Sequence, residues 1–470
     1  MSGDPKFLNT ERVGEEIVEP ILNNDPPDGA YGWVVVISAF FVHVFVLGNV
    51  YSFGVFYPIY IDVFKDSPAN IAWIGSIGFC MLAGFGGLAG KWADEFGNGL
   101  IVFIGGLFIS SGYFISSYST SLWQLYLTHG FLVGCGYSLS FIAGVGVIGQ
   151  WFSTRRGLAT GLAVSGSGLG QFVMSITTQN LVENCGWRIT LRYLALISLV
   201  GLSICGWFIR RRIPCTKKIS SESSFVMFKD RNFNLLYAGA FFSSLGLVMP
   251  FTHLPLYAIK NGVSGSNAVW LLSCMGIASA VGRISMGFFA DKYGKMRMLV
   301  LCVFGGGVST LCWMACVTFP TLIVFSAVFG LFAGGLISLM PAVTAELFGI
   351  QRQSSVIGLL YTSTSVGNLL SAPIGGYLYA VYGNYILPIS VAGAFMMFSL
   401  IFLTLIGNPS SSPSATDNSA AMAIDSTIEG GNHYSICTSL ELQQLASIDD
   451  ADNEATLVLK AEAVDNPLDL

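Results

Sequence analysis

The stretch GKWADEFG, residues 90–97, returns almost unchanged 197 residues later as GFFADKYG, residues 287–294. Both copies read G-x-x-A-D-x-aromatic-G, and both lie between apolar runs of similar length. A short polar turn that recurs at matching places along a chain predicts two halves of the same design.

Within each copy, a glycine precedes an aspartate by four residues. This spacing puts Gly90 and Asp94, and likewise Gly287 and Asp291, on one face of a helix. We expect the glycines to allow close approach of a neighbouring helix. We expect the aspartates to lie at the inner end, where they accept backbone N–H groups or pair with arginine. Two halves that share such a turn are typical of a duplicated transporter.

The composition predicts an all-α protein that crosses the membrane many times. Of the 470 residues, 53% are apolar and 10% are charged, whereas about 25% are charged in a typical soluble domain. A spanning helix needs about 20 mostly apolar residues, and twelve such stretches are present. They lie at 33–58, 70–92, 99–118, 121–150, 156–182, 188–209, 233–259, 266–290, 297–318, 320–347, 354–381 and 384–407.

The chain divides into five predicted parts. Six spanning helices at 31–209 and six at 233–407 form two pseudo-symmetric bundles, which a basic linker at 210–232 joins. The N-terminal tail, 1–30, holds seven acids and two bases, and the C-terminal tail, 408–470, holds eleven acids and one base. We expect both tails to be disordered spacers, with docking of a partner as the alternative.

The distribution of Lys and Arg predicts that both termini are cytoplasmic. In this orientation the inner loops hold fourteen basic residues and the outer loops hold four, as the positive-inside rule requires. The reverse orientation puts Arg210, Arg211 and Arg212 outside. We expect no cleavable signal peptide, because acids stand where a positively charged N-terminal region is needed.

Three longer motifs carry a resemblance to a known family. They are DGAYGW at 28–33, WFSTRRGLATGLAVSGSGLG at 151–170 and ELFGIQRQSSVIGL at 346–359. They resemble motifs of the monocarboxylate porter family, and the repeated turn resembles the loop signature of the major facilitator superfamily, to which that family belongs. The resemblance covers residues 30–407 and implies the major facilitator fold, a fungal-type member and a location in the plasma membrane. Relatives carry lactate-like acids, aromatic amino acids, thyroid hormones or, in fungi, riboflavin, so the sequence does not name the substrate.

The residues of the first two motifs have separate predicted roles. The resemblance implies a structural or gating role for Asp28, and Gly32 belongs to the same motif. Trp33 is a predicted anchor at the membrane interface. We expect Arg155 and Arg156 to anchor the inner end near lipid phosphates, with contact to the substrate as the alternative.

Small residues follow at helical spacing. Gly157 and Gly161 stand four apart, as do Gly166 and Gly170, so we expect neighbouring backbones to pack closely here. Such a seam suits rocking of one bundle against the other, and ordinary tight packing is the alternative. Glu346 closes a helix at the inner face and is expected to act as a gate or to pair with a loop.

Arg283 is the strongest candidate for contact with a solute. It stands in SCMGIASAVGRISMGFFAD, on the order of 10 Å into the apolar layer. A charge at the centre of a spanning helix costs about 2.5–3.5 kcal/mol and is tolerated where it faces a cavity or a partner. The arginine fork binds a carboxylate with two hydrogen bonds, and the resemblance implies a substrate-binding arginine at this position. The alternatives are snorkelling to the inner surface and pairing with an acid in a loop.

Proton coupling needs a different group from the one that the family uses. Where proton-coupled relatives carry an aspartate and a lysine, this chain has Ser279 and Tyr51. His43 and His253 are therefore the candidates for a proton site, because histidine titrates near neutral pH. For both, a hydrogen-bonded packing role is the alternative. Asn49 and Tyr51 are candidates for hydrogen bonds to the solute.

These residues predict a secondary transporter that moves a small organic anion, with a monocarboxylate as the expected class, by alternating access, and with protons as the candidate coupling ion for symport. One alternative is a facilitator of aromatic amino acids, riboflavin or another weakly charged solute. A second is a non-transporting sensor that signals through 408–470. We expect no enzyme activity, cofactor, metal site or nucleic-acid partner, since no motif for them is present. The expected partners are a small-molecule solute and the lipid bilayer.

Overall fold

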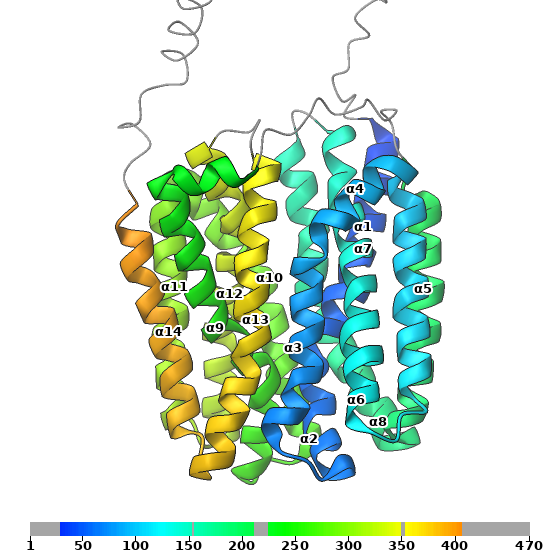
Figure 1. Ribbon diagram of the computed structural model, residues 1–470, viewed down its shortest axis with the longest axis vertical. Coiled ribbons are helices and arrows are strands. Elements are labelled where there is room, and N and C mark those ends of the chain that lie inside the picture. The colour runs from blue at the N-terminus through cyan, green and yellow to red at the C-terminus, as the bar shows by residue number, and fades with distance from the viewer. Residues whose placement is uncertain (1–28, 153–154, 211–223, 349–352, 407–470) are drawn as a thin grey trace, which may run out of the picture. The chain divides into compact units, whose positions relative to one another are not determined.

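The structure is a computed structural model that describes residues 29–152, 155–210, 224–348 and 353–406. All of them belong to one compact unit, Met1–Gly407. This part of the chain is helical and contains no strand (Figure 1). Both predicted tails, apart from residues 29 and 30, and most of the predicted linker lie outside the described residues.

The helices fall into two sets. The first set is α1 (Ala30–Tyr51), α2 (Phe53–Phe64), α3 (Pro68–Gly84), α4 (Gly86–Phe96), α5 (Asn98–Ser116), α6 (Leu122–Leu125), the π-helix η1 (Tyr126–Leu132), α7 (Val133–Gly146), the short η2 (Ile148–Gln150) and α8 (Arg156–Phe208). The second set is η3 (Ser224–Lys229), α9 (Arg231–Lys260), α10 (Gly265–Tyr293), α11 (Lys295–Cys312), η4 (Trp313–Ala315), α12 (Phe319–Phe348), α13 (Gln353–Tyr382) and α14 (Ile386–Thr404). We call these sets the first half and the second half.

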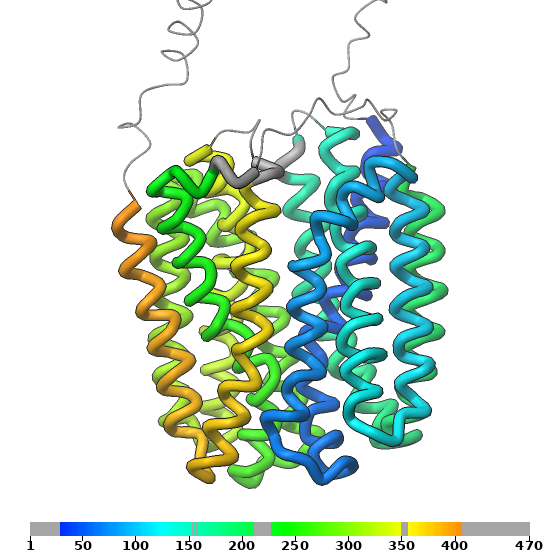
Figure 2. The backbone as a smooth tube through the Cα atoms, in the orientation of Figure 1, coloured from blue at the N-terminus to red at the C-terminus, as the bar shows by residue number. Residues whose placement is uncertain are grey.

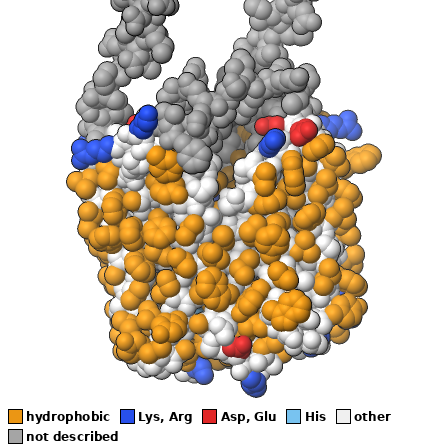
Figure 3. Space-filling model, in the orientation of Figure 1, with side chains coloured by type: hydrophobic (Ala, Val, Ile, Leu, Met, Phe, Trp, Pro, Cys, Tyr) orange, Lys and Arg blue, Asp and Glu red, His pale blue; other side chains and the backbone are white. Residues whose placement is uncertain are grey.

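The helix lengths are consistent with the twelve predicted spans. Among the described residues, nine helical segments are long and apolar enough to cross a membrane, and the pair α3 and α4, bent by 49°, makes a tenth. The 53 residues of α8 are interrupted at Gly186, where φ is 76°, so α8 comprises two helices. α13 adds a helix of 30 residues. Figure 3 shows hydrophobic side chains over the middle of one face and charged side chains at its two ends, as a membrane body requires.

The repeated turn has the same backbone in both halves. Gly97 ends α4 with φ 100° and ψ 140°, and Gly294 ends α10 with φ 97° and ψ 134°. Their N–H groups donate to the carbonyl oxygens of Ala93 (3.1 Å) and Ala290 (2.9 Å), the alanines of the motif. The next helix begins at the following residue each time. The motif therefore recurs because each half needs a glycine-only backbone to turn directly from one spanning helix into the next.

The first glycine of each copy does not have its predicted role. A Cβ on Gly90 would meet only an ordinary contact, 3.7 Å from Ile142, and none of the described atoms lies within 4 Å of a Cβ on Gly287. The expectation of close helix approach at these two glycines is wrong, because no neighbouring backbone among the described residues lies close to either position.

Three helix pairs provide most of the contact between the halves: α3 with α13, α8 with α10, and α2 with α9. The α3–α4 pair and α10 both end in the repeated turn, so they are counterparts, and α13 is the counterpart of the first part of α8 in chain order. A two-fold rotation that relates the halves therefore places the α3–α13 contact on the α8–α10 contact, and the reverse. Figures 1 and 2 show α1–α7, blue to cyan, beside α9–α14, green to orange.

The small residues of α8 allow two neighbouring helices, α1 and α10, to approach closely. A Cβ on Gly166 would lie 2.3 Å from the Phe40 carbonyl oxygen of α1, and one on Gly168 would lie 2.5 Å from the Gly276 carbonyl oxygen of α10. Gly170 packs equally closely on α1. At Gly161 no described atom lies within 4 Å, so the predicted close packing is confirmed for the later glycines and wrong for Gly161.

Candidate functional site

The first two sequence motifs lie against each other at the start of α1. The ring of Trp33 meets Phe152 edge-on with ring centroids 5.0 Å apart, and Tyr31 packs on Trp151 at 5.2 Å. A Cβ on Gly32 would lie 2.8 Å from the Phe152 ring, so only glycine fits there without a shift. Residues about 120 positions apart in the sequence thereby fix the start of α1 on the segment that leads into α8.

The charged motif residues lie at exposed helix ends, away from the interior. Arg155, Asp94, Asp291 and Glu346 are all exposed. Asp28 lies outside the described residues, as does the side chain of Arg156. The anchoring and gating roles of these residues stay predictions.

Arg283 is buried deep in α10. It is 6% exposed, and none of its three guanidinium nitrogens has a hydrogen-bond partner among the described residues. α10 continues for ten residues beyond it to Tyr293, which places Arg283 about 15 Å from that end of α10. Because the guanidinium is enclosed, the side chain does not reach the surface at this end of the helix.

His43 of α1 lies within electrostatic range of Arg283. Its ring is fully buried beside Phe141. Nδ1 donates a hydrogen bond of 2.7 Å to the Ala39 carbonyl oxygen, because a carbonyl can only accept. Nε2 is buried and has no partner among the described residues. The structure therefore places a half-satisfied imidazole of the first half within electrostatic range of an unpaired guanidinium of the second half.

His253 of α9 has a different environment. Its Nε2 donates to the Ala372 carbonyl oxygen at 2.9 Å, and its Nδ1 accepts from the Tyr385 hydroxyl at 3.4 Å. Both ring nitrogens of neutral His253 are satisfied by residues of α13 and of the turn before α14. This arrangement is typical of a packing histidine rather than of a group that gains and loses a proton.

Asn49 and Tyr51 lie at the end of α1 and are both buried. The Asn49 amide donates to the Phe45 carbonyl oxygen at 2.6 Å. Tyr51 stacks on Phe251 of the second half, with ring centroids 4.7 Å apart. Tyr361 of α13 lies within electrostatic range of both Tyr51 and Arg283. Tyr361 thus links Tyr51 of the first half and Arg283 of the second half electrostatically.

Sequence reasoning missed three polar residues of the interior, which are His129, Tyr137 and Gln171. His129, in the π-helix η1, is 6% exposed and lines a cavity of about 10 Å³ together with Asn49 and Tyr137. Gln171 of α8 is 1% exposed with an unpaired Nε2. His129 stands alone in the apolar run LYLTHGFL, and that solitary histidine was the available signal.

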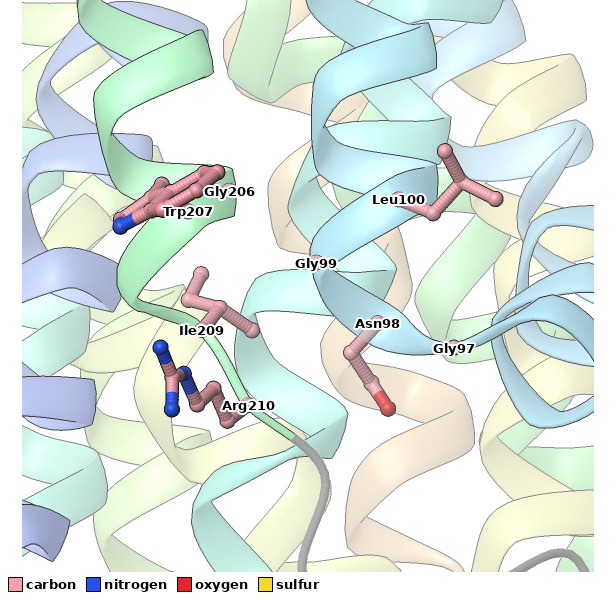
Figure 4. Close-up of a pocket in the computed structure, with 8 residues that line it drawn as sticks. All are labelled: Gly97, Asn98, Gly99, Leu100, Gly206, Trp207, Ile209 and Arg210. Carbon is pink, nitrogen blue, oxygen red and sulfur yellow. The ribbon is translucent and has the colours of Figure 1, made fainter.

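Another pocket lies elsewhere, within the first half. It has a volume of about 350 Å³ and is lined by the start of α5 and the end of α8, with Trp207 and Arg210 among its residues (Figure 4). Both walls belong to one half, and Arg210 is exposed. This groove is therefore not a site between the halves.

Comparison with known proteins agrees with this architecture. The model of the Major Facilitator Superfamily matches residues 39–314 and 236–445. Monocarboxylate transporter 12 of Mus musculus is 31% identical over 422 residues, which cover 81% of this chain and 86% of the relative. Monocarboxylate transporter 13 of Rattus norvegicus is 33% identical and covers 80% and 89%.

A fungal relative is similar to the same degree. The aspyridones efflux protein of Emericella nidulans is 30% identical over 377 residues, which cover 79% of this chain and 77% of the relative. Helices of spanning length, the two related halves and these matches lead to one conclusion. The chain is a multi-pass membrane transporter that belongs to the Major Facilitator Superfamily and is related to the monocarboxylate transporters.

Proposed function

We propose that this chain carries a small organic anion, with a monocarboxylate as the expected class, and that Arg283 binds its carboxylate. The observation that carries the proposal is the buried, unpaired guanidinium. Removing a charge from water without a partner costs several kcal/mol, so such a group is retained where a partner binds during the working cycle. A carboxylate fits the planar fork with two parallel hydrogen bonds.

We further propose that His43 takes the coupling proton. With Nδ1–H held by the Ala39 carbonyl oxygen, a second proton can enter only at Nε2. The positive charge of Arg283 disfavours binding of that proton. A bound carboxylate removes this electrostatic penalty, because it neutralises the guanidinium. Solute and proton then bind together, which gives electroneutral symport. His253, the other histidine candidate, has no free nitrogen for this role.

The halves, 31–209 and 233–407, are the proposed moving bodies. Their interface includes the backbone contact of Gly168 with Gly276, and small residues at such a contact allow one helix to tilt on another. The solute site then opens to each side in turn. The basic inner loops support cytoplasmic termini, and the plasma membrane is the expected location.

A facilitator of a weakly charged solute is the second candidate. The observation that favours it is the uncharged, aromatic surroundings of the site, where Tyr51 and Ser279 replace charged residues of proton-coupled relatives. An uptake rate that does not change with an imposed pH gradient supports this candidate. An uptake rate that rises with an inward proton gradient supports the first.

The test is uptake into liposomes that contain the purified chain, with labelled lactate, phenylalanine and riboflavin as the panel. We expect Arg283→Ala to abolish uptake of the acid that the wild type carries. Arg283→Lys, which keeps the charge but not the fork, should retain a small fraction of it. Lys260→Ala removes an exposed charge and should behave as wild type. Near-normal uptake by Arg283→Ala at equal protein amounts would remove Arg283 from the mechanism.

A further inference from the structure

We propose that the first half holds a second solute subsite, which accepts a hydroxyl group of the transported anion. This proposal rests on the proposed function and adds a feature of the substrate. The site is the cavity of about 10 Å³ between α1, α2, α3, η1 and α7. Its lining includes Asn49, Phe53, Gly78, Phe79, His129 and Tyr137.

His129 supplies the free hydrogen-bonding atom of this cavity. Its Nδ1 lies 3.1 Å from the Tyr60 hydroxyl, and its ring is enclosed by aromatic side chains such as Phe53 at 5.7 Å and Tyr113 at 5.2 Å. The Tyr60 contact is the one hydrogen bond of this side chain among the described residues, so Nε2 is available at the cavity wall. A nitrogen there can bind a water molecule or a polar group of a ligand.

The lining selects an uncharged group. Asn49, His129 and Tyr137 are polar, and no Asp, Glu, Lys or Arg lines this cavity. The volume accommodates about one water-sized group. A hydroxyl meets both conditions, whereas a carboxylate is too large and would lack a counter-charge there.

Two irregular backbone segments border the cavity. The helix tightens locally at Ser52, between α1 and α2, where φ is −85° and ψ is 0° and the Val55 N–H donates to the Ser52 carbonyl oxygen. Asn49 and Phe53 stand on either side of this position. Opposite them, residues Tyr126–Leu132 form a π-helix that contains His129. Local departures from α-helical hydrogen bonding, π segments among them, occur frequently at functional sites. The coincidence of both at one cavity indicates a ligand site rather than a packing gap.

The cavity lies within reach of the anion site. Val50 lines it and follows His43 by seven residues, so both are on one face of α1, about 10 Å apart along the helix axis. The ring of Phe79, in the cavity wall, contacts Tyr51 at 5.8 Å. We therefore infer an elongated carboxylic acid with an apolar body and a hydroxyl distal to the carboxylate.

The experiment compares two acids that differ by that hydroxyl. Liposomes with the full chain take up 3-(4-hydroxyphenyl)propanoate or 3-phenylpropanoate, and we expect the wild type to favour the former by about threefold to tenfold, as one neutral hydrogen bond provides. Gly78→Ala should fill the cavity without a clash, because a Cβ there has 3.9 Å to its nearest atom, the Gly130 carbonyl oxygen. The preference should then fall to about one, with uptake of 3-phenylpropanoate retained. His129→Phe should give the same loss.

The control variant is Gly87→Ala, where no described atom lies within 4 Å of the added Cβ, and it should keep the preference. Equal uptake of the two acids by the wild type, uptake of neither, or an unchanged preference in Gly78→Ala would overturn the subsite and leave the cavity as a space for water. Arg283→Ala reports on the proposed function alone, because it should abolish uptake of both acids whatever Gly78→Ala does.

Discussion

The ring of Tyr57 stands edge-on against the imidazole of His253, with ring centroids 4.8 Å apart, and this contact joins the two halves. Tyr57 of α2 is fully buried, and its hydroxyl donates to the Pro68 carbonyl oxygen at 2.9 Å. Tyr385 holds the other side of His253. Figure 1 shows α2 and the α4 turn at opposite ends of the bundle, so this cluster closes the end that lies away from the repeated turns.

Truncation of Tyr57 should weaken this closure. Tyr57→Ala removes the ring from a filled space, and we expect a loss of about 3–5 kcal/mol in the free energy of unfolding. Tyr57→Phe keeps the ring contact and loses one hydrogen bond, at a cost of about 1 kcal/mol. Thermal unfolding of the detergent-solubilised variants measures the order. Equal losses for the two variants would mean that the hydrogen bond, not the ring, holds this end.

A methyl group at Gly168 should interfere with the joint between the halves. The added Cβ would lie 2.5 Å from the Gly276 carbonyl oxygen, so α8 and α10 must separate, and overpacking of this kind costs about 1–3 kcal/mol. We expect Gly168→Ala to lower the uptake rate at unchanged surface amounts. Gly161→Ala, on the same helix with free space around it, is the matched control. Equal rates for both variants would show that this backbone contact does not limit transport.

Local sequence patterns predicted the fold well, because the turns and spanning helices depend on the residues within each segment. The repeated turn marks two glycines with φ near 100°, and apolar runs of spanning length mark the helices. Arg283 could be identified because a charge inside such a run is rare. These signals do not depend on which segments meet in space.

The features that could not be predicted from the sequence depend on contacts between residues far apart in the chain. His43 and His253 read alike in the sequence, but Nδ1 of His43 bonds a carbonyl four residues away, whereas His253 meets Ala372 and Tyr385, which are 119 and 132 residues away. The π-helix around His129 packs against α3 and α5, and no local sequence pattern reports those contacts. Gly161 and Gly166 look equivalent, yet only Gly166 meets a neighbouring backbone.

Alanine substitutions at different glycines of the repeated turn should have opposite effects on the free energy of unfolding. At Gly97 and Gly294 the backbone has a conformation that is strained for any L side chain, so alanine at either position should cost about 1–3 kcal/mol although space is free. Gly287→Ala lies in a regular helix with free space and should be neutral or stabilise by about 0.5–1 kcal/mol. Unfolding of the three variants in detergent checks this. A similar loss in Gly287→Ala would mean that burial in the full chain, not backbone conformation, decides the outcome.

His43→Gln should separate proton coupling from solute binding. Glutamine can keep a hydrogen bond to the Ala39 carbonyl oxygen and cannot take a proton, so the variant should still exchange labelled for unlabelled solute across the membrane. An inward proton gradient should no longer accelerate its uptake. The carboxylate still neutralises Arg283, but the variant lacks the imidazole that would take up the proton. His253→Gln is the matched comparison, since it removes an equally buried imidazole whose two nitrogens are already satisfied. It should lower the amount of folded protein and keep the response to the gradient. If His43→Gln keeps that response and His253→Gln loses it, the proton site belongs to the second half, and the pairing of His43 with Arg283 is structural.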